Sequence, residues 1–157
     1  MRRLATLLCL ALAAPTGLAG ARAIAPGELA VASSGWVVSA QGDRAVLAGR
    51  DGGSLLAACR EGRTTLAVLW PTEMGDGGHR LVTIRAGGAP ERERWRLSGA
   101  RLVGEGRGLL QRVAEAGHLT VQAAASPTGP LRTQRFEAPG TRHALASLAR
   151  RCGWFFG

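Results

Sequence analysis

Short apolar stretches, separated by turn residues, follow one another through most of the chain and predict a series of β-strands. Residues 91–97 alternate strictly between arginine and other side chains, which predicts a half-buried strand with its arginines in water. One face of this strand carries Arg92, Arg94 and Arg96, and the other carries Glu93, Trp95 and Leu97. The predicted strands cover residues 36–39, 44–48, 54–60, 64–70, 81–85, 91–97, 118–125 and 131–136.

Helical spacing of apolar residues occurs in two places. Leu109, Leu110 and Val113 form one stripe, and Gly117 follows them as a natural C-terminal stop. A second helix is predicted from Thr141, a suitable N-cap, to Cys152. The order of strands, helix, hairpin and closing helix predicts an α+β domain, a mainly antiparallel β-sheet of about seven to eight strands with two short helices.

The first residues have the pattern of a secretory signal peptide. Arg2 and Arg3 form a positive n-region, and residues 4–14 form an apolar run too short for a permanent membrane span. Residues 21–23 match the small-x-small pattern that signal peptidase accepts. We therefore expect cleavage after Ala23 and localisation in the periplasm, with a buried N-terminal helix as the alternative.

After the predicted signal peptide of residues 1–23, the chain divides into a flexible lead-in over 24–34 and a single domain over 35–157. No later stretch approaches the roughly 20 apolar residues that a membrane span requires, so we expect no transmembrane segment after cleavage. All 20 basic residues are arginine, and loss of the three in the signal peptide lowers the formal net charge from +9 to +6. This charge permits contact with anionic polymers or membrane surfaces but does not require it.

Two cysteines, Cys59 and Cys152, remain after the predicted cleavage. An even pair in an exported chain predicts a disulfide in an oxidising compartment. The bridge would link the closing helix to the strand over 54–60, and it is worth about 4–5 kcal/mol in the chain-entropy model. A metal site or a catalytic thiol is the alternative, but the chain has no CxxC motif.

The chemistry-bearing residues form no catalytic or metal-binding motif. His79, His118 and His143 are scattered, with no pair at metal-ligand spacing. The chain has no G-x-S-x-G motif, and the glycines of 104–108 match neither a phosphate-binding loop nor a dinucleotide fingerprint and predict turns. We therefore expect no enzymatic activity, no cofactor and no metal.

The arginine stripe of Arg92, Arg94 and Arg96, with Arg101 just beyond it, is the strongest candidate for a binding surface. Guanidinium forks bind carboxylates and phosphates, so the stripe could hold an anionic polymer or a partner. Nucleic acid is not expected, because the compartment is wrong and stacking aromatics are few. The favoured alternative is an edge strand that its charges protect from aggregation.

The tail of Trp154, Phe155 and Phe156 is the second candidate surface. The three aromatic side chains either pack beside the disulfide or remain exposed as a tip that docks on a partner. The packed arrangement is the favoured alternative.

Several of these sequence features occur together in one known family. They are Trp36-Val37-Val38, the strands over 55–59 and 65–70, Trp95-x-Leu97-Ser98, the Phe136 strand and Cys152-Gly153-Trp154. In this order they resemble the periplasmic type VI secretion-associated proteins of the VasI/TagO kind. The resemblance implies a non-enzymatic accessory protein with an envelope or secretion-machine protein as its partner. The alternative function is a periplasmic module that binds anionic envelope polymers through the arginine-lined strand.

Overall fold

A computed structural model describes residues 29–31, 35–75 and 77–157. The predicted signal peptide and the remainder of the predicted lead-in lie outside the described residues. The elements are β1 (Leu29–Val31), β2 (Trp36–Ser39), β3 (Arg44–Ala48), β4 (Ser54–Arg60), β5 (Arg63–Leu69), β6 (Gly78–Arg85), β7 (Glu91–Ser98), β8 (Arg101–Glu105), α1 (Arg107–Ala116), β9 (His118–Ala124), β10 (Leu131–Glu137), α2 (Thr141–Ala144) and α3 (Ala146–Arg151).

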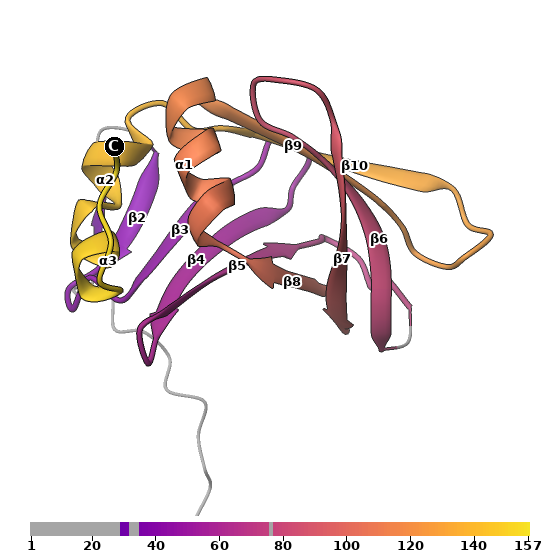
Figure 1. Cartoon of the computed structure of the whole chain (residues 1–157). Helices are drawn as coiled ribbons and strands as arrows, with labels where there is room; N and C mark the ends of the chain where they lie inside the picture. The colour runs from indigo at the N-terminus through magenta and orange to yellow at the C-terminus, as the bar shows by residue number, and fades with distance from the viewer. Residues whose placement is uncertain (1–28, 32–34, 76) are drawn as a thin grey trace, which may run out of the picture.

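All the strands of the described residues belong to one antiparallel sheet, in the order β1-β2-β3-β4-β5-β8-β7-β6-β9-β10 (Figure 1). The first five strands are neighbours in sequence, whereas β5 pairs with β8 and β6 pairs with β9 across long insertions. The predicted α+β class with a mainly antiparallel sheet is therefore confirmed.

The sheet bends strongly, so that its last strand approaches the turn between β3 and β4. Arg50 N donates a hydrogen bond to the carbonyl oxygen of Arg135 on β10, over 2.9 Å. The buried side chain of Gln134 accepts a hydrogen bond from Gly53 N in the same turn. The helices complete the enclosure, with α1 against β5 and β9, α2 against β2, and α3 against β4 (Figure 1).

The inner face of the bent sheet and the helices enclose one apolar core. Its largest fully buried side chains include Trp36, Trp95 and Phe136. Strands β3 and β4 alternate between buried and more exposed residues, as expected for a sheet with one wet face. Burial of this apolar surface is the main favourable contribution to folding.

The sheet has two strands that the sequence pattern did not predict. Residues 29–31 form β1 and pair with β2, so this part of the predicted flexible lead-in is a strand. Residues 101–105 form β8, although Gly104 was expected in a turn. The indole ring of Trp95 occupies the space that a side chain at residue 104 would need.

The predicted helices are present, with one change. The first, α1, ends at Gly117, whose φ of 71° is left-handed as expected for a C-terminal glycine. The second is divided into α2 and α3 at Leu145, which is fully buried. The two segments together bury Ala144 and Leu148 in the core, so the predicted apolar stripe is used despite the division.

Candidate functional site

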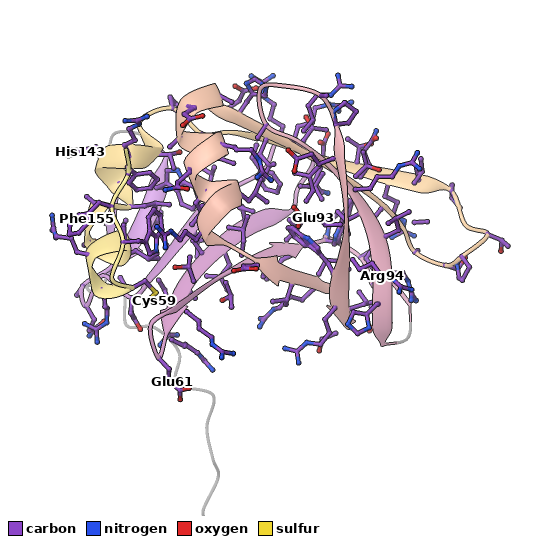
Figure 2. The ribbon with its side chains drawn as sticks, viewed as in Figure 1. Cys59, Glu61, Glu93, Arg94, His143 and Phe155 are labelled. Atoms are coloured by element: carbon purple, nitrogen blue, oxygen red, sulfur yellow. A yellow bond between two sulfur atoms is a disulfide. The ribbon has the colours of Figure 1, made fainter. Side chains whose placement is uncertain are left out.

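The arginine stripe lies on the outer face of the sheet. Arg92, Arg94 and Arg96 are exposed, and the alternate residues of the strand, Trp95 and Leu97, are buried. No ion pair is formed by these three arginines among the described residues. The structure thus places the three cations side by side in water, as the alternation predicted (Figure 2, where Arg94 is labelled).

The interpretation of this strand as a charged edge is wrong. β7 lies in the interior of the sheet, hydrogen-bonded to β6 on one side and to β8 on the other. A strand that is paired on both sides offers no free backbone edge, so its arginines have no edge to protect. Protection from aggregation therefore does not account for the stripe.

The strand register shows which residues share the outer face with the stripe. Arg92, Arg94 and Arg96 lie opposite Thr83, Leu81 and His79 of β6, respectively. On the other side, Arg101 of β8 lies opposite Ser98 at the end of the stripe. All four predicted arginines are therefore on one face, with Arg101 at its border.

The carboxylates of β7 point to the other side of the sheet. Glu91 and Glu93 (the latter labelled in Figure 2) form ion pairs with Arg112 of α1, at 3.2 and 3.6 Å. Glu93 Oε2 also accepts a hydrogen bond from Trp95 Nε1 over 2.8 Å. In contrast, no carboxylate occupies an outward position of β6, β7 or β9, all of which are described strands. The alternation therefore leaves the outward positions of these three strands without a carboxylate, whereas Glu105 of β8 and Glu137 of β10 lie on the same outer face.

The same face contains a pocket that the sequence analysis missed. It has a volume of about 340 Å³ and opens to solvent next to the turn between β6 and β7. It is lined by Thr83, Arg85, Pro90, Thr120, Gln122 and Arg135. These residues come from β6, β9, β10 and the turn, and no sequence pattern indicates that β6 pairs with β9 across β7, β8 and α1.

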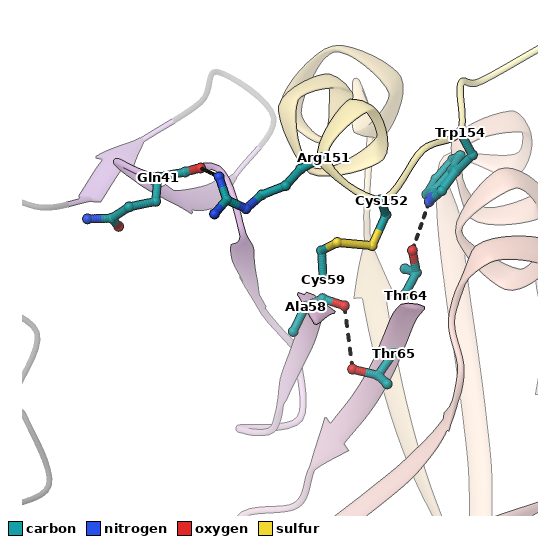
Figure 3. The surroundings of a disulfide bond; sticks show 8 residues. All are labelled: Gln41, Ala58, Cys59, Thr64, Thr65, Arg151, Cys152 and Trp154. Carbon is teal, nitrogen blue, oxygen red and sulfur yellow. Dashed lines mark hydrogen bonds between the residues drawn. A yellow bond between two sulfur atoms is a disulfide. The ribbon is translucent and has the colours of Figure 1, made fainter. Parts of the chain in front are cut away.

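The predicted disulfide between Cys59 and Cys152 is confirmed (Figure 3). The two Cα atoms are 5.7 Å apart, within the usual range for a bridge. The bond joins the end of α3 to β4, and both cysteines are buried. Its role is therefore structural, since a buried disulfide at a helix end offers no thiolate for catalysis.

The aromatic tail is mostly packed rather than free. Trp154 is buried, and its Nε1 donates a hydrogen bond to Thr64 Oγ1 over 2.8 Å (Figure 3). Phe156 makes an edge contact with the Trp154 ring, with centroids 4.9 Å apart. Phe155 is 71% exposed and is the residue of the tail that remains available to a partner (Figure 2).

The histidines are not gathered into a site. His79 lies near the start of β6, His118 begins β9, and His143 is in α2. Among residues 29–31, 35–75 and 77–157, no group of three or more histidine, cysteine, aspartate or glutamate side chains could hold a metal ion. No helix within the same ranges is both long enough and apolar enough to span a membrane.

Comparisons with protein-family models, with curated proteins and with solved structures found no match to this chain. The resemblance to the VasI/TagO proteins therefore stays a prediction from the sequence.

Proposed function

We propose that this chain is a non-enzymatic, exported accessory protein that binds anionic polymers of the cell envelope through the outer face of its sheet. The observation that carries this proposal is the exposed stripe of Arg92, Arg94 and Arg96, which has no ion pair among the described residues. The periplasmic location rests on the signal-peptide pattern of the N-terminus.

The spacing of the stripe suits a ligand with repeated charges. Alternate residues of a strand lie about 6.6 Å apart, so the three guanidinium groups form a row about 13 Å long. Each guanidinium can donate two parallel hydrogen bonds to a carboxylate or a phosphate. A polymer that repeats such groups can contact several arginines at once, which raises its apparent affinity without a deep pocket.

A second candidate function is docking on a secretion-machine protein, as the resemblance to type VI secretion-associated proteins implies. The exposure of Phe155 favours it, because a large aromatic side chain that is 71% exposed is a suitable anchor for a partner. Docking of this kind is apolar and should depend little on salt, whereas polymer binding by arginine should weaken with ionic strength.

Binding to polygalacturonate and to polyphosphate, measured by fluorescence titration, tests the polymer proposal. We expect replacement of Arg92, Arg94 and Arg96 by Ser to weaken binding at least about tenfold and to flatten its decline between about 50 and 300 mM salt. The matched control replaces Arg60, Arg63 and Arg150, which are also exposed, so that the net charge is identical. Wild-type affinity in the stripe variant, or equal loss in the control, would contradict the proposal.

The export proposal has a separate test in the intact mass of the protein from the periplasmic fraction. We expect a chain that begins at Ile24 and whose two cysteines are alkylated only after reduction. An uncleaved chain would contradict the signal-peptide prediction, and thiols that react without reductant would contradict the Cys59–Cys152 bridge.

A further inference from the structure

Two arginines from different strands, Arg85 and Arg135, line the pocket on the outer face. In the strand register, Thr120 of β9 lies opposite Arg85 of β6 on one side and opposite Arg135 of β10 on the other. Neighbouring strands are about 4.8 Å apart, so the Cα atoms of the two arginines are separated by about 10 Å. Both side chains are long enough to meet above Thr120, because an arginine reaches as far as half of that distance.

Polar side chains complete the lining of the pocket. Thr83 lies opposite Gln122 in the next row of the register, and the Gln122 amide donates a hydrogen bond to Thr133 Oγ1 over 3.2 Å, which orients it. Pro90 forms a wall at the turn before β7. A volume of about 340 Å³ lies at the lower end of the range for small-molecule sites.

The charges around the pocket favour an anion. Arg85 has no ion pair among the described residues, and Arg92 lies opposite Thr83 at the border of the pocket. Arg135 forms an ion pair with Asp51, whose Oδ1 is 3.6 Å from Arg135 Nη1. Both side chains are partly exposed, so the ion pair is weak, and Asp51 stays anchored by the hydrogen bond that Arg135 N donates to its Oδ2 over 3.1 Å.

We infer that this pocket, lined by Arg85 and Arg135, binds a phosphate monoester carried on a small polar molecule such as a sugar. Two guanidinium forks and the hydroxyl groups of Thr83 and Thr120 offer more donors than the two oxygens of a carboxylate can accept. A phosphate monoester presents three strong acceptor oxygens and a charge near −2 at neutral pH. The remaining volume, beside Pro90 and Gln122, would hold the group that carries the phosphate.

This site adjoins the stripe at Arg92, but the inference does not rest on polymer binding by the stripe. The stripe binds by repetition of charge along β7, whereas the pocket is a single shallow, open position across β6, β9 and β10. The phosphate monoester could be a free sugar phosphate or the end of an envelope glycan, because the recognised chemistry is the same.

The test is a titration of the ¹⁵N-labelled domain with glucose 6-phosphate, glucuronate and glucose, followed by NMR. We expect glucose 6-phosphate to shift the amides of residues 83, 85, 120, 122 and 135. Arg85→Gln and Arg135→Gln should each weaken binding about tenfold or more, since each removes a charged hydrogen-bonding fork. Arg85→Lys keeps the charge but not the fork, and it should cause a smaller loss.

The control is the Ser variant of Arg94 and Arg96, which keeps Arg92 beside the pocket and should bind glucose 6-phosphate with an affinity within about threefold of wild type. Its result distinguishes failure of the pocket from failure of the stripe. A phosphorylated envelope oligosaccharide, before and after treatment with phosphatase, distinguishes the sources: tighter binding than glucose 6-phosphate, lost on treatment, assigns a glycan end. Glucuronate binding equal to that of glucose 6-phosphate, or an unchanged affinity in Arg85→Gln and Arg135→Gln, would overturn the inference.

Discussion

At the residue scale, threonine hydroxyl groups accept hydrogen bonds from the indole N–H groups of two buried tryptophans. Trp154 Nε1 donates to Thr64 Oγ1, and Trp36 Nε1 donates to Thr141 Oγ1 over 3.1 Å, across a sequence separation of 105 residues. An indole N–H buried without an acceptor is costly, so these threonines are needed where they lie. The sequence analysis predicted Thr141 as a helix N-cap, which is wrong: the N-cap of α2 is Gly140, and no side chain caps this helix. The bond to Trp36 could not be predicted, because the tryptophan is far away in the chain.

Replacement of Trp154 by Phe should destabilise the protein. The change leaves Thr64 Oγ1 without its donor and removes part of a buried ring, and we expect a loss of about 2–4 kcal/mol in the free energy of unfolding measured in urea. Thr64→Val in the same background should cost less than it does alone, because the two residues share one hydrogen bond. Phe155→Leu, at an exposed position of the same tail, is the control and should cost little. Strict additivity of the two changes would contradict the assigned bond.

Asp43, in the turn between β2 and β3, has a lowered pKa, which predicts that the stability of the fold depends on pH. The hydroxyl of Ser39 donates to Asp43 Oδ1 over 2.7 Å and holds the pKa of this carboxyl below its ordinary value. Partial burial opposes this effect, and Arg44, 3.4 Å from Oδ2, adds to it. Since the folded-state pKa is the lower one, Asp43 stabilises the fold above about pH 4, and this contribution is lost as the pH falls through the folded pKa.

Ser39→Ala should therefore raise the pKa of Asp43 toward its ordinary value, as measured from the ¹³C shift of the carboxyl group. At neutral pH we expect a loss of about 0.5–1.5 kcal/mol in the free energy of unfolding, and a smaller difference in acid, where Asp43 is protonated in both proteins. Ser39→Thr keeps the hydroxyl and should resemble wild type. A pKa that does not move in Ser39→Ala would refute the assignment.

At the element scale, the strands with clear alternation and the first helix were predictable, whereas β8 was not. The glycines of residues 104–108 resemble a loop, but Gly104 is in a strand because the Trp95 indole lies against it. Gly106 likewise approaches the backbone of residue 65 too closely for a side chain. Such glycines are selected by a neighbour from another strand, and local pattern cannot distinguish them from turn glycines.

Gly104 and Gly108 provide a matched pair of substitutions. A Cβ at residue 104 would lie 2.4 Å from Trp95 Cε2, so Gly104→Ala should destabilise the fold by about 1–3 kcal/mol. A Cβ at residue 108 meets nothing nearer than 3.8 Å and lies in α1, so Gly108→Ala should stabilise by up to about 1 kcal/mol. Thermal unfolding of both variants checks this, and equal effects would show that β8 is not packed as described.

At the scale of the whole molecule, the order of strands decides where the candidate site lies. The stripe on β7 could be predicted because alternation is a local property of one strand. The pocket could not, since Arg85, Thr120 and Arg135 meet only through the β6–β9 and β9–β10 pairings. The β6–β9 pairing joins segments that are separated by two strands and a helix. The local sequence pattern therefore predicted the arginine stripe on β7 but not the pocket beside it.

The stability of the whole fold should depend on the disulfide. Cys59→Ala with Cys152→Ala frees a closed loop with a sequence separation of 93 residues, and we expect a loss of about 4–5 kcal/mol in the free energy of unfolding in urea. The wild-type protein in dithiothreitol should approach the stability of the double variant. If the reductant leaves the unfolding midpoint of the wild type unchanged, the bridge makes no such contribution.

The bridge also makes the chain between Cys59 and Cys152 a covalent ring that contains β5 to β10 and the helices α1, α2 and α3. A protease that cuts one exposed turn inside the ring, such as that between β6 and β7, opens it without releasing a fragment. The two pieces would migrate as one band on a gel without reductant and separate only with it. In an oxidising compartment the cut protein would thus stay whole, and the same cut would divide it wherever thiols are kept reduced.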